Sequence, residues 1–322
     1  MEDIRIQPDD APSAGYAALS ESAGLVEFPH TTILRLTGKD PIGMLDAVLT
    51  NEVPKDEHLG TYAALLNPKG RVQTDLRVLK GDEDVLVLTE SEGAETAKEI
   101  LGRYATFSRV KIEDHSSGDE PWGILGIYGP RAKSFFGDPV LAEHETMRTE
   151  IGGASVLVTG VAAPVYGYDV ICPSSTLDAV RNQLLEAGAI PARHDDYETA
   201  RVLSGLPLFG MDITPDNFPG ESEGFLERAV SFGKGCYPGQ ETVARMRYRG
   251  SPNKKLYRFV LDGDPPVPGT EITQDEKQVG TLTSVAPLPV NGTTFALGYL
   301  SRKADPEGQL HTGDAKLRTL SG

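Results

Sequence analysis

The residues best suited to chemistry lie in one short stretch, KGCYPGQE, at positions 234–241. Its Cys236 is one of only two cysteines in the chain. The order Pro-Gly-Gln-Glu predicts a helix that begins just after the cysteine and ends near Gly250. Cys236 would then lie beside the unpaired N–H groups of that helix and near Lys234, an environment that makes a thiol more reactive. The alternative is a tight turn around a half-buried cysteine.

The same stretch belongs to a basic window in an acidic chain. Between Arg228 and Arg258 there are eight Lys and Arg but one acid, Glu241, so the local balance is 8 − 1 = +7, whereas the whole chain carries −16. This reversal suggests a site for an anionic group next to the thiol. A solvated helix face is the alternative interpretation.

Composition narrows the class of protein. A chain of 322 residues can bury a large core and predicts two or three domains. Its 47 acids against 31 bases favour solubility at high salt, so a halophilic source is our hypothesis, and they argue against direct nucleic-acid binding. No apolar run has membrane-spanning length, and the acidic N-terminus lacks the apolar region of a signal peptide. We therefore expect a cytoplasmic protein that does not bind membranes.

Cysteine and histidine usage predicts no disulfide framework and no metal site. Two cysteines cannot form such a framework, and Cys172 falls in a strand-like run where it would be a small buried hydrophobe. The six histidines are scattered without the spacing of metal ligands.

The predicted strands and helices that must position these residues follow the order β-α-β-β-α-β twice, which is typical of ferredoxin-like units. From about Leu256 onward, short β segments alternate with Pro and Gly and predict a small antiparallel barrel. The predicted domains are 1–252, with two interleaved ferredoxin-like subdomains, and 253–322, the barrel. The predicted strands are 31–38, 62–66, 71–80, 84–89, 110–113, 122–128, 155–159 and 168–172, and the predicted helices are 41–49, 95–104, 131–136, 175–187 with a serine cap, and 197–203.

Taken in order, these segments resemble the folate-binding superfamily of the glycine-cleavage T-protein (GcvT) over nearly the whole chain. Residues 66–76 (LNPKGRVQTDL) are similar to the first hairpin of that family, residues 201–207 (RVLSGLP) to its arginine-bearing segment, and residues 280–284 and 296–299 to its barrel. KGCYPGQE resembles the signature of the YgfZ-type branch, because T-proteins generally have an acid where Cys236 falls. The resemblance implies an α+β fold with ferredoxin-like subdomains around a central folate cavity, plus a C-terminal antiparallel β-barrel.

The resemblance also implies site residues. Asp75 matches the carboxylate that T-proteins hold near the reacting folate nitrogen, and Arg201 matches an arginine of the pterin region. It makes Asp75 and Cys236 the expected catalytic residues. The expected folate-binding residues are Asp75, Arg201, Lys234, Tyr237 and Gln240.

Two departures from the family weaken a transferase assignment. Thr74 replaces an acid that usually precedes the Asp75 position. The glutamate that holds the pterin in T-proteins falls at Val165, unless Asp169 or another acid substitutes for it. From the residues alone, Asp75 could instead face solvent on its strand. Arg201 could form a surface ion pair with one of the nearby acids, which are Asp195, Asp196 and Glu198.

The resemblance favours a tetrahydrofolate-binding accessory protein, taking the cofactor itself or a one-carbon-substituted form. It would support assembly or repair of iron–sulfur proteins, and indirectly tRNA modification by such enzymes. Cys236 would act as a reactive thiol or a transient ligand to a cluster shared with a partner, and the basic window would neutralise the folate glutamate tail or an acidic partner. Two alternatives stay open: a folate-dependent aminomethyltransferase, if the chain is an enzyme, and a non-catalytic scaffold.

Overall fold

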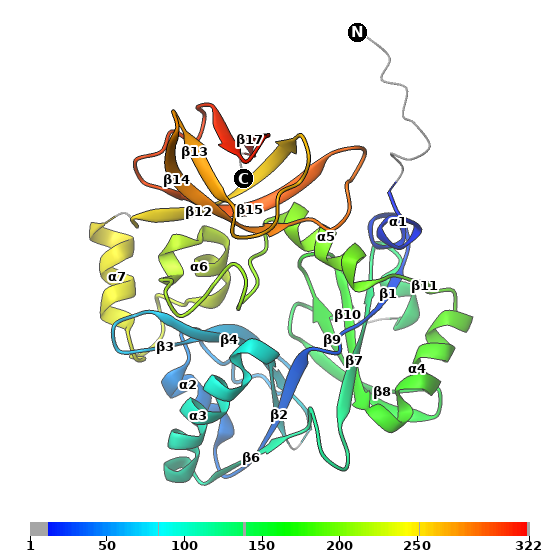
Figure 1. Cartoon of the computed structure of the whole chain (residues 1–322). Helices are drawn as coiled ribbons and strands as arrows, with labels where there is room; N and C mark the ends of the chain where they lie inside the picture. Colours follow the sequence, from blue (N-terminus) through cyan, green and yellow to red (C-terminus); the bar gives the residue numbers. More distant parts are fainter. Residues whose placement is uncertain (1–11, 83, 138–139, 251, 321–322) are drawn as a thin grey trace.

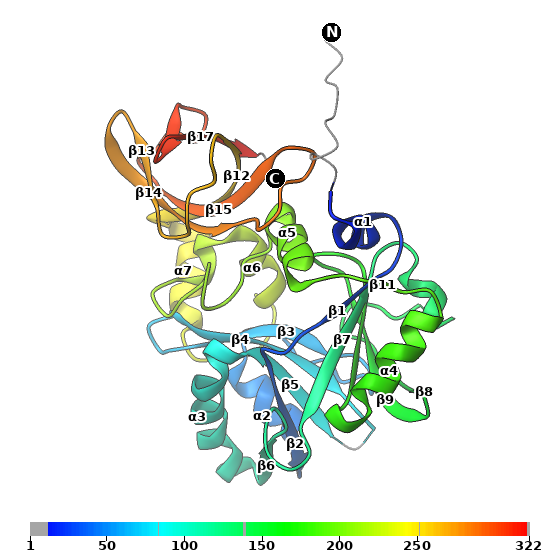
Figure 2. The ribbon, with the colours of Figure 1, turned by 45° about the vertical axis from the view of Figure 1, so that its right-hand side comes forward.

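The computed structural model describes residues 12–82, 84–137, 140–250 and 252–320. Figure 1 shows two α/β layers side by side, with a β-barrel above them. Figure 2, turned by 45°, shows α3 and α4 on the outer sides of their sheets, away from each other. Among the residues described, no helix is long and apolar enough to cross a membrane.

The first layer is a five-stranded sheet of order β3-β4-β5-β2-β6, in which every pairing is antiparallel. Its helices pack on the sheet through leucines, valines and alanines. Asp40 caps α2 by accepting from the Gly43 N–H at 2.8 Å, and Pro41 opens the helix. The elements are β2 (Thr31–Gly38), α2 (Pro41–Val48), β3 (Thr61–Leu66), β4 (Val72–Lys80), β5 (Val85–Glu90), α3 (Ser91–Ser108) and β6 (Val110–Asp114).

The second layer is a six-stranded sheet of order β11-β1-β7-β10-β9-β8. The chain starts in this sheet with β1, leaves to build the first layer, and returns with β7, so the two layers are interleaved in sequence. The elements are α1 (Ala14–Glu21), β1 (Gly24–Glu27), β7 (Trp122–Tyr128), the short 3-10 helix η2 (Ala132–Phe135), β8 (Thr146–Ile151), β9 (Ala154–Val161), β10 (Gly167–Pro173), α4 (Ser174–Glu186) and β11 (Ile190–Pro191).

The inner faces of the two sheets pack against each other over part of their area. Apolar side chains from both layers form one shared cluster that includes Ile33, Leu88, Ile124 and Ile171. A strand that is covered by helices on one face and by the neighbouring sheet on the opposite face is apolar on both faces. This explains why β5 reads as a continuous apolar run rather than as an alternating strand.

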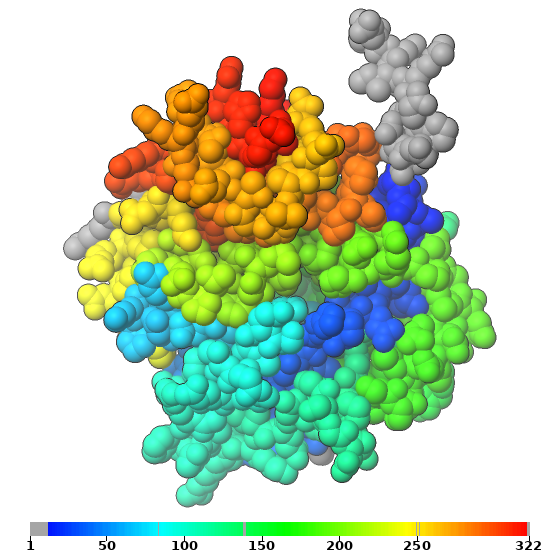
Figure 3. All heavy atoms as spheres, in the orientation of Figure 1, coloured from blue at the N-terminus to red at the C-terminus, as the bar shows by residue number. Residues whose placement is uncertain are grey.

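A helical segment connects the layers to the barrel. It contains α5 (His194–Ser204), η3 (Pro219–Glu221), α6 (Glu223–Ala229) and α7 (Gln240–Arg249). The barrel is closed in the order β12-β15-β14-β13-β16-β17, and Figure 3 shows it seated on this segment. Its strands are β12 (Lys254–Asp262), β13 (Glu271–Gln274), β14 (Lys277–Val285), β15 (Thr294–Ser301), β16 (Leu310–Thr312) and β17 (Ala315–Leu320).

The predicted α+β fold with a C-terminal antiparallel barrel is confirmed. Two local predictions were wrong, and one predicted helix is longer than expected. Residues 131–136 form only the four-residue η2, between Gly129 and Gly137, which both have positive φ. The N-cap of α4 is Pro173, without a side-chain cap. The helix predicted over 95–104 is present and runs from Ser91 to Ser108. Position 93 in its first turn is a glycine, where a Cβ would lie 2.0 Å from the Thr74 hydroxyl oxygen.

Candidate functional site

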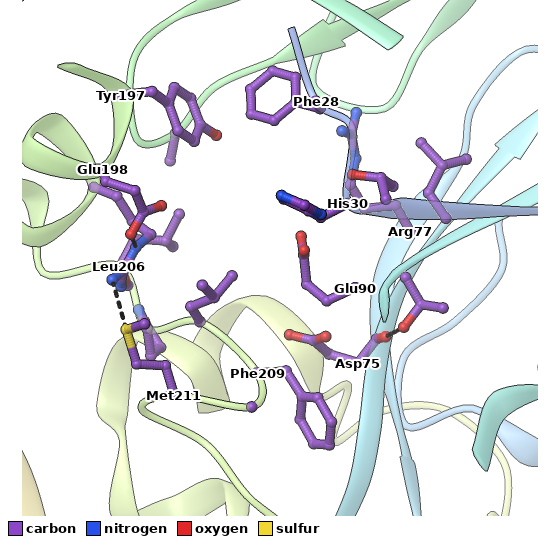
Figure 4. A pocket seen from close by; sticks show the side chains of 18 of the residues that line it. Phe28, His30, Asp75, Arg77, Glu90, Tyr197, Glu198, Leu206, Phe209 and Met211 are labelled. Atoms are coloured by element: carbon purple, nitrogen blue, oxygen red, sulfur yellow. Dashed lines mark hydrogen bonds and ion pairs between the residues drawn. The ribbon is translucent and has the colours of Figure 1, made fainter. Parts of the chain in front are cut away.

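A cavity of about 510 Å³ lies where the two sheets, the helical segment and the barrel meet. Its wall comes from the β1–β2 connection, β4, β5, β7, β10, α5 and the loop after α5, with Pro268, Val285 and Pro287 added from the barrel region. Figure 4 shows side chains from both layers pointing into this space. Residues far apart in sequence therefore meet at one site.

Asp75 of β4 faces the cavity and not the solvent. It is 8% exposed, and its carboxylate accepts a hydrogen bond of 2.5 Å from the Tyr62 hydroxyl of β3. Burial raises the pKa of Asp75 to about 6, although the Tyr62 hydrogen bond acts in the opposite direction. The solvent-facing alternative for Asp75 is thus wrong.

Glu90 at the end of β5 is a second carboxyl in the same space, and the sequence had not singled it out. Its side chain points into the cavity near Asp75 and His30 (Figure 4). Burial, and then the charges of Asp75, Glu92 and Glu198, raises the pKa of Glu90 to about 8. The cavity therefore holds two carboxyls whose charge depends on pH near neutrality.

Arg77 and Asp169 join the two layers across the cavity. Arg77 of β4 forms an ion pair with Asp169 of β10, and the Tyr128 hydroxyl donates to the other carboxylate oxygen of Asp169. Asp169 is the acid that we considered as a substitute for the pterin-binding glutamate. It lines the cavity, but both its oxygens already have partners, whereas Val165 packs in an apolar cluster beside Tyr128.

Arg201 lies at the cavity wall, 2% exposed, with all of its donor nitrogens engaged. It donates to Glu198 at 2.9 Å and to Asp212 at 2.8 Å, and Ser284 of the barrel accepts at 3.0 Å. The Leu206 carbonyl and the Met211 sulfur accept the remaining bonds. The surface ion pair expected as the alternative is therefore a buried network. Through it, Arg201 fixes α5, the following loop and the barrel relative to one another.

The upper part of the cavity is aromatic. Phe28, Tyr128 and Tyr197 contact one another, with ring centroids of Phe28 and Tyr197 4.9 Å apart. His144 adds a ring that stays neutral, because burial, with Arg77 and Arg228 nearby, lowers its pKa to about 2. A flat apolar ring with polar edges fits such a wall.

The KGCYPGQE loop is not part of the cavity lining. Cys236 is exposed, and Tyr237 is buried in an apolar cluster with Phe225 of α6, which raises its pKa to about 12. Lys234 donates to the carbonyls of Asp46, Leu49 and Asn51 at 2.6–3.0 Å, so its ammonium holds the end of α2. Gln240 is the first residue of α7. The structure thus brings Asp75 and Arg201 together, but not Lys234, Cys236, Tyr237 or Gln240 with them.

The loop instead supports the hairpin that carries Asp75. Gly239 has φ 83°, and a Cβ there would lie 2.6 Å from the Asn67 carbonyl oxygen and 2.8 Å from the Gly70 Cα. Gly70 in turn approaches Thr242 of α7. The two glycine-bearing motifs, the β3–β4 turn and KGCYPGQE, are therefore packed backbone to backbone.

The basic window separates into two groups. Several of its cations are engaged inside the fold: Arg228 pairs with Glu143 at 2.8 Å, and Arg258 donates to the Leu203 carbonyl at 2.8 Å. Arg245 and Arg247 of α7 are exposed, and the Arg247 guanidinium lies 3.9 Å from the Phe232 ring centroid. Neither Arg245 nor Arg247 lines the cavity, so the role of the basic window toward a folate tail stays a prediction.

Comparison with known proteins agrees with this architecture. The family model of the GCVT N-terminal domain matches residues 8–234, and that of the CAF17 C-terminal beta-barrel domain matches residues 253–320. An aminomethyltransferase of Staphylococcus carnosus is 25% identical over 299 residues, covering 89% of this chain and 81% of that protein. The tRNA-modifying protein YgfZ of Yersinia pestis is 25% identical over 312 residues, covering 92% and 90%.

Among solved structures, the glycine cleavage system aminomethyltransferase T from Bartonella henselae shares the fold. Its TM-score is 0.78 at 17% identity, over 96% of this chain and 87% of that one. The GCVT model alone covers well over half of the chain. With the CAF17-type barrel and the YgfZ relatives, these matches show that the chain belongs to the GCVT family, as a YgfZ-type member of the GcvT superfamily.

Proposed function

We propose that the cavity binds tetrahydrofolate or a one-carbon-substituted form of it. The observation that carries the proposal is the convergence of Asp75 and the Arg201 network on one 510 Å³ cavity in a GCVT-family chain. This volume lies within the usual range of small-molecule sites. The rings of Phe28 and Tyr197 would flank the pterin, and Asp75 would face its reactive nitrogen.

The geometry refines the roles of two site residues, Arg201 and Asp169. Because Arg201 has no free donor, we assign it to positioning Glu198 and the loop at 206–211, rather than to direct contact with the pterin. Because Asp169 is held by Arg77 and Tyr128, the pterin amidine edge would be recognised by another acid of the wall, such as Glu198. We keep Asp75 as the residue nearest the chemistry.

We further propose an accessory role, in which the folate-bound protein supports assembly or repair of iron–sulfur enzymes and, through them, tRNA modification. The CAF17-type barrel and the relatives named tRNA-modifying protein YgfZ support this branch over a T-protein. The exposed Cys236, outside the cavity, is placed where a partner protein could reach its thiol. Lys234, Tyr237 and Gln240 would then serve this loop rather than the folate.

Calorimetric titration with tetrahydrofolate tests the ligand. Asp75→Asn removes a carboxylate that is ionised above about pH 6 and should weaken binding by about 1–3 kcal/mol, the usual loss for a hydrogen bond to a charged group. Asp178→Asn, at a side chain 82% exposed on α4, is the matched control and should bind as the wild type does. Absence of heat with any reduced folate would refute the proposal and favour the scaffold alternative.

A folate-dependent aminomethyltransferase is the second candidate. The relatives named aminomethyltransferase and the buried position of Asp75 favour it. Conversion of an aminomethylated lipoyl carrier to methylene-folate and ammonia would establish it, and Asp75→Asn should abolish that turnover.

A further inference from the structure

The charges that line the cavity are not balanced. Each arginine in the wall is paired with an acid, whereas three lining carboxyls, those of Asp75, Glu90 and Glu92, form no ion pair among the residues described. Among the residues described, the Glu90 side chain has no hydrogen bond or ion pair, and the only side-chain partner of the Asp75 carboxylate is the Tyr62 hydroxyl. The ion pairs of the lining arginines are Arg77 with Asp169, Arg201 with Glu198 and Asp212, and Arg228 with Glu143, and Arg77 keeps its Nε and Nη2 without a hydrogen-bond partner.

Strand pairing holds two of these carboxyls, those of Asp75 and Glu90, close together. In the antiparallel pair β4–β5, the ladder ends with Arg77 opposite Leu88. Asp75 and Glu90 each lie two residues beyond that pair, so their side chains point to the same face as those of Arg77 and Leu88. The Thr89 hydroxyl donates to the Asp75 carbonyl at 2.7 Å and fixes the strands at this point. Figure 4 shows both carboxyls directed into the cavity.

We propose that Asp75 and Glu90 form a subsite that binds a positively charged group of the ligand. Among folates, the site would therefore prefer a cationic one-carbon form, such as methenyl-tetrahydrofolate with its amidinium, over neutral forms. This inference rests on the proposed folate binding and names the class of one-carbon unit.

When no ligand is bound, protonation reduces the negative charge of the two carboxyls. The pKa values of Asp75 and Glu90 are raised to about 6 and about 8, chiefly by burial. Glu90 is faced by Asp75 from β4, Glu92 from α3, and Glu198 and Arg201 from α5. The three acids raise its pKa and Arg201 lowers it. At pH 7 the pair holds about one proton, which an incoming cation would displace, so binding of a cation should release a proton and strengthen as the pH rises toward 8.

The test compares methenyl-tetrahydrofolate with 5-formyl-tetrahydrofolate, which is neutral at the same position, on the full chain. Binding is measured by rapid mixing, before the cation hydrolyses, at pH 6, 7 and 8. The cation should bind about 10-fold more tightly at pH 8, as expected for a close pair of opposite charges in a partly buried site, and this preference should shrink toward pH 6. Calorimetry in buffers of different ionisation enthalpy should detect the released proton.

Glu90→Gln is the decisive variant, because an amide mimics the protonated carboxyl and preserves the fold. It should lose most of the preference for the cation over 5-formyl-tetrahydrofolate, and the pH dependence of that preference. Glu95→Gln, at an α3 side chain 88% exposed, should behave as the wild type does. Equal affinity for the two folates, or an unchanged preference in Glu90→Gln, would overturn the subsite while leaving folate binding intact. Failure of both folates to bind would refute the proposed function, and the subsite with it.

A second measurement on the same variant reports on Glu90 without any ligand. Because its pKa rises from 4.5 to about 8 on folding, the stabilisation due to this carboxyl is present below about pH 4.5 and is lost as the pH rises to about 8. The free energy of unfolding of the wild type should therefore fall relative to Glu90→Gln between about pH 5 and pH 8. Parallel pH profiles would show that Glu90 is solvated, contrary to the subsite.

Discussion

At the scale of single residues, burial decides which side chains can do chemistry. Asp75 and Glu90 have raised pKa values because burial removes their carboxyls from water and neither forms an ion pair, whereas Asp169 and Arg77 neutralise each other. The same distinction separates the two cysteines. Cys172 is 1% exposed within β10, and burial raises the pKa of its thiol, whereas Cys236 is exposed in a glycine-flanked loop.

The two thiols should therefore differ in reactivity. We expect Cys236 to be alkylated rapidly in the native protein and Cys172 only after unfolding. Cys236→Ser should change the free energy of unfolding by less than about 0.5 kcal/mol, because it leaves no cavity. The measurement is alkylation of each thiol followed by mass spectrometry, together with complementation of a strain lacking a YgfZ-type protein. Full complementation by Cys236→Ser, with equally slow alkylation of both thiols, would show that the thiol is structural.

At the scale of elements, the sequence predicted the strands and helices better than their contacts. The turn at 67–70 and the helix after Gly239 were both predictable, because Pro, Gly and Asn specify local backbone conformations. Their contact with each other was not, since nothing local in either motif indicates that Gly239 packs on Gly70. Glu90 was missed for a related reason. Its significance comes from the β4–β5 pairing, which brings it near Asp75, and strand register depends on tertiary packing.

The backbone contact at Gly239 predicts that a side chain at this position destabilises the protein. Gly239→Ala places a Cβ against the β3–β4 turn at a positive φ, and should lower the free energy of unfolding by about 1–3 kcal/mol. Gly235→Ala, in the same loop, places its Cβ in open space and should be nearly neutral. Urea unfolding of both variants measures the difference. Equal stabilities would mean that the loop does not press on the hairpin.

At the scale of the whole molecule, the sequence indicated the fold class and the barrel, because strand periodicity and Pro-Gly spacing persist over long segments. It could not place the barrel relative to the cavity. That placement depends on Asp212, which accepts hydrogen bonds from Arg201 of α5 and from Thr283 and Ser284 of β14. We retain as a proposal that 1–252 and 253–322 are separate domains, with this buried network holding them together.

The charge of the whole chain leads to the last prediction. A formal net charge of −16 produces repulsion across the folded surface, and salt screens it with a Debye length of about 10 Å at 0.1 M and about 3 Å at 1 M. The unfolding temperature should therefore rise as KCl is increased from about 0.1 to about 1 M. Replacing the exposed Arg245 and Arg247 by Glu changes the net charge from −16 to −16 − 4 = −20. This variant should be less stable than the wild type at low salt and approach it at high salt.

Thermal unfolding of both proteins across the salt series measures the effect, and an equal concentration of an uncharged osmolyte separates screening from general exclusion of solute. Screening predicts that the two curves converge as salt rises, because the variant differs from the wild type only in exposed charge. Curves that stay parallel would locate the effect of the two arginines in local packing, such as that of Arg247 on Phe232. An unfolding temperature independent of salt would contradict the hypothesis that this acidic surface is adapted to high salt.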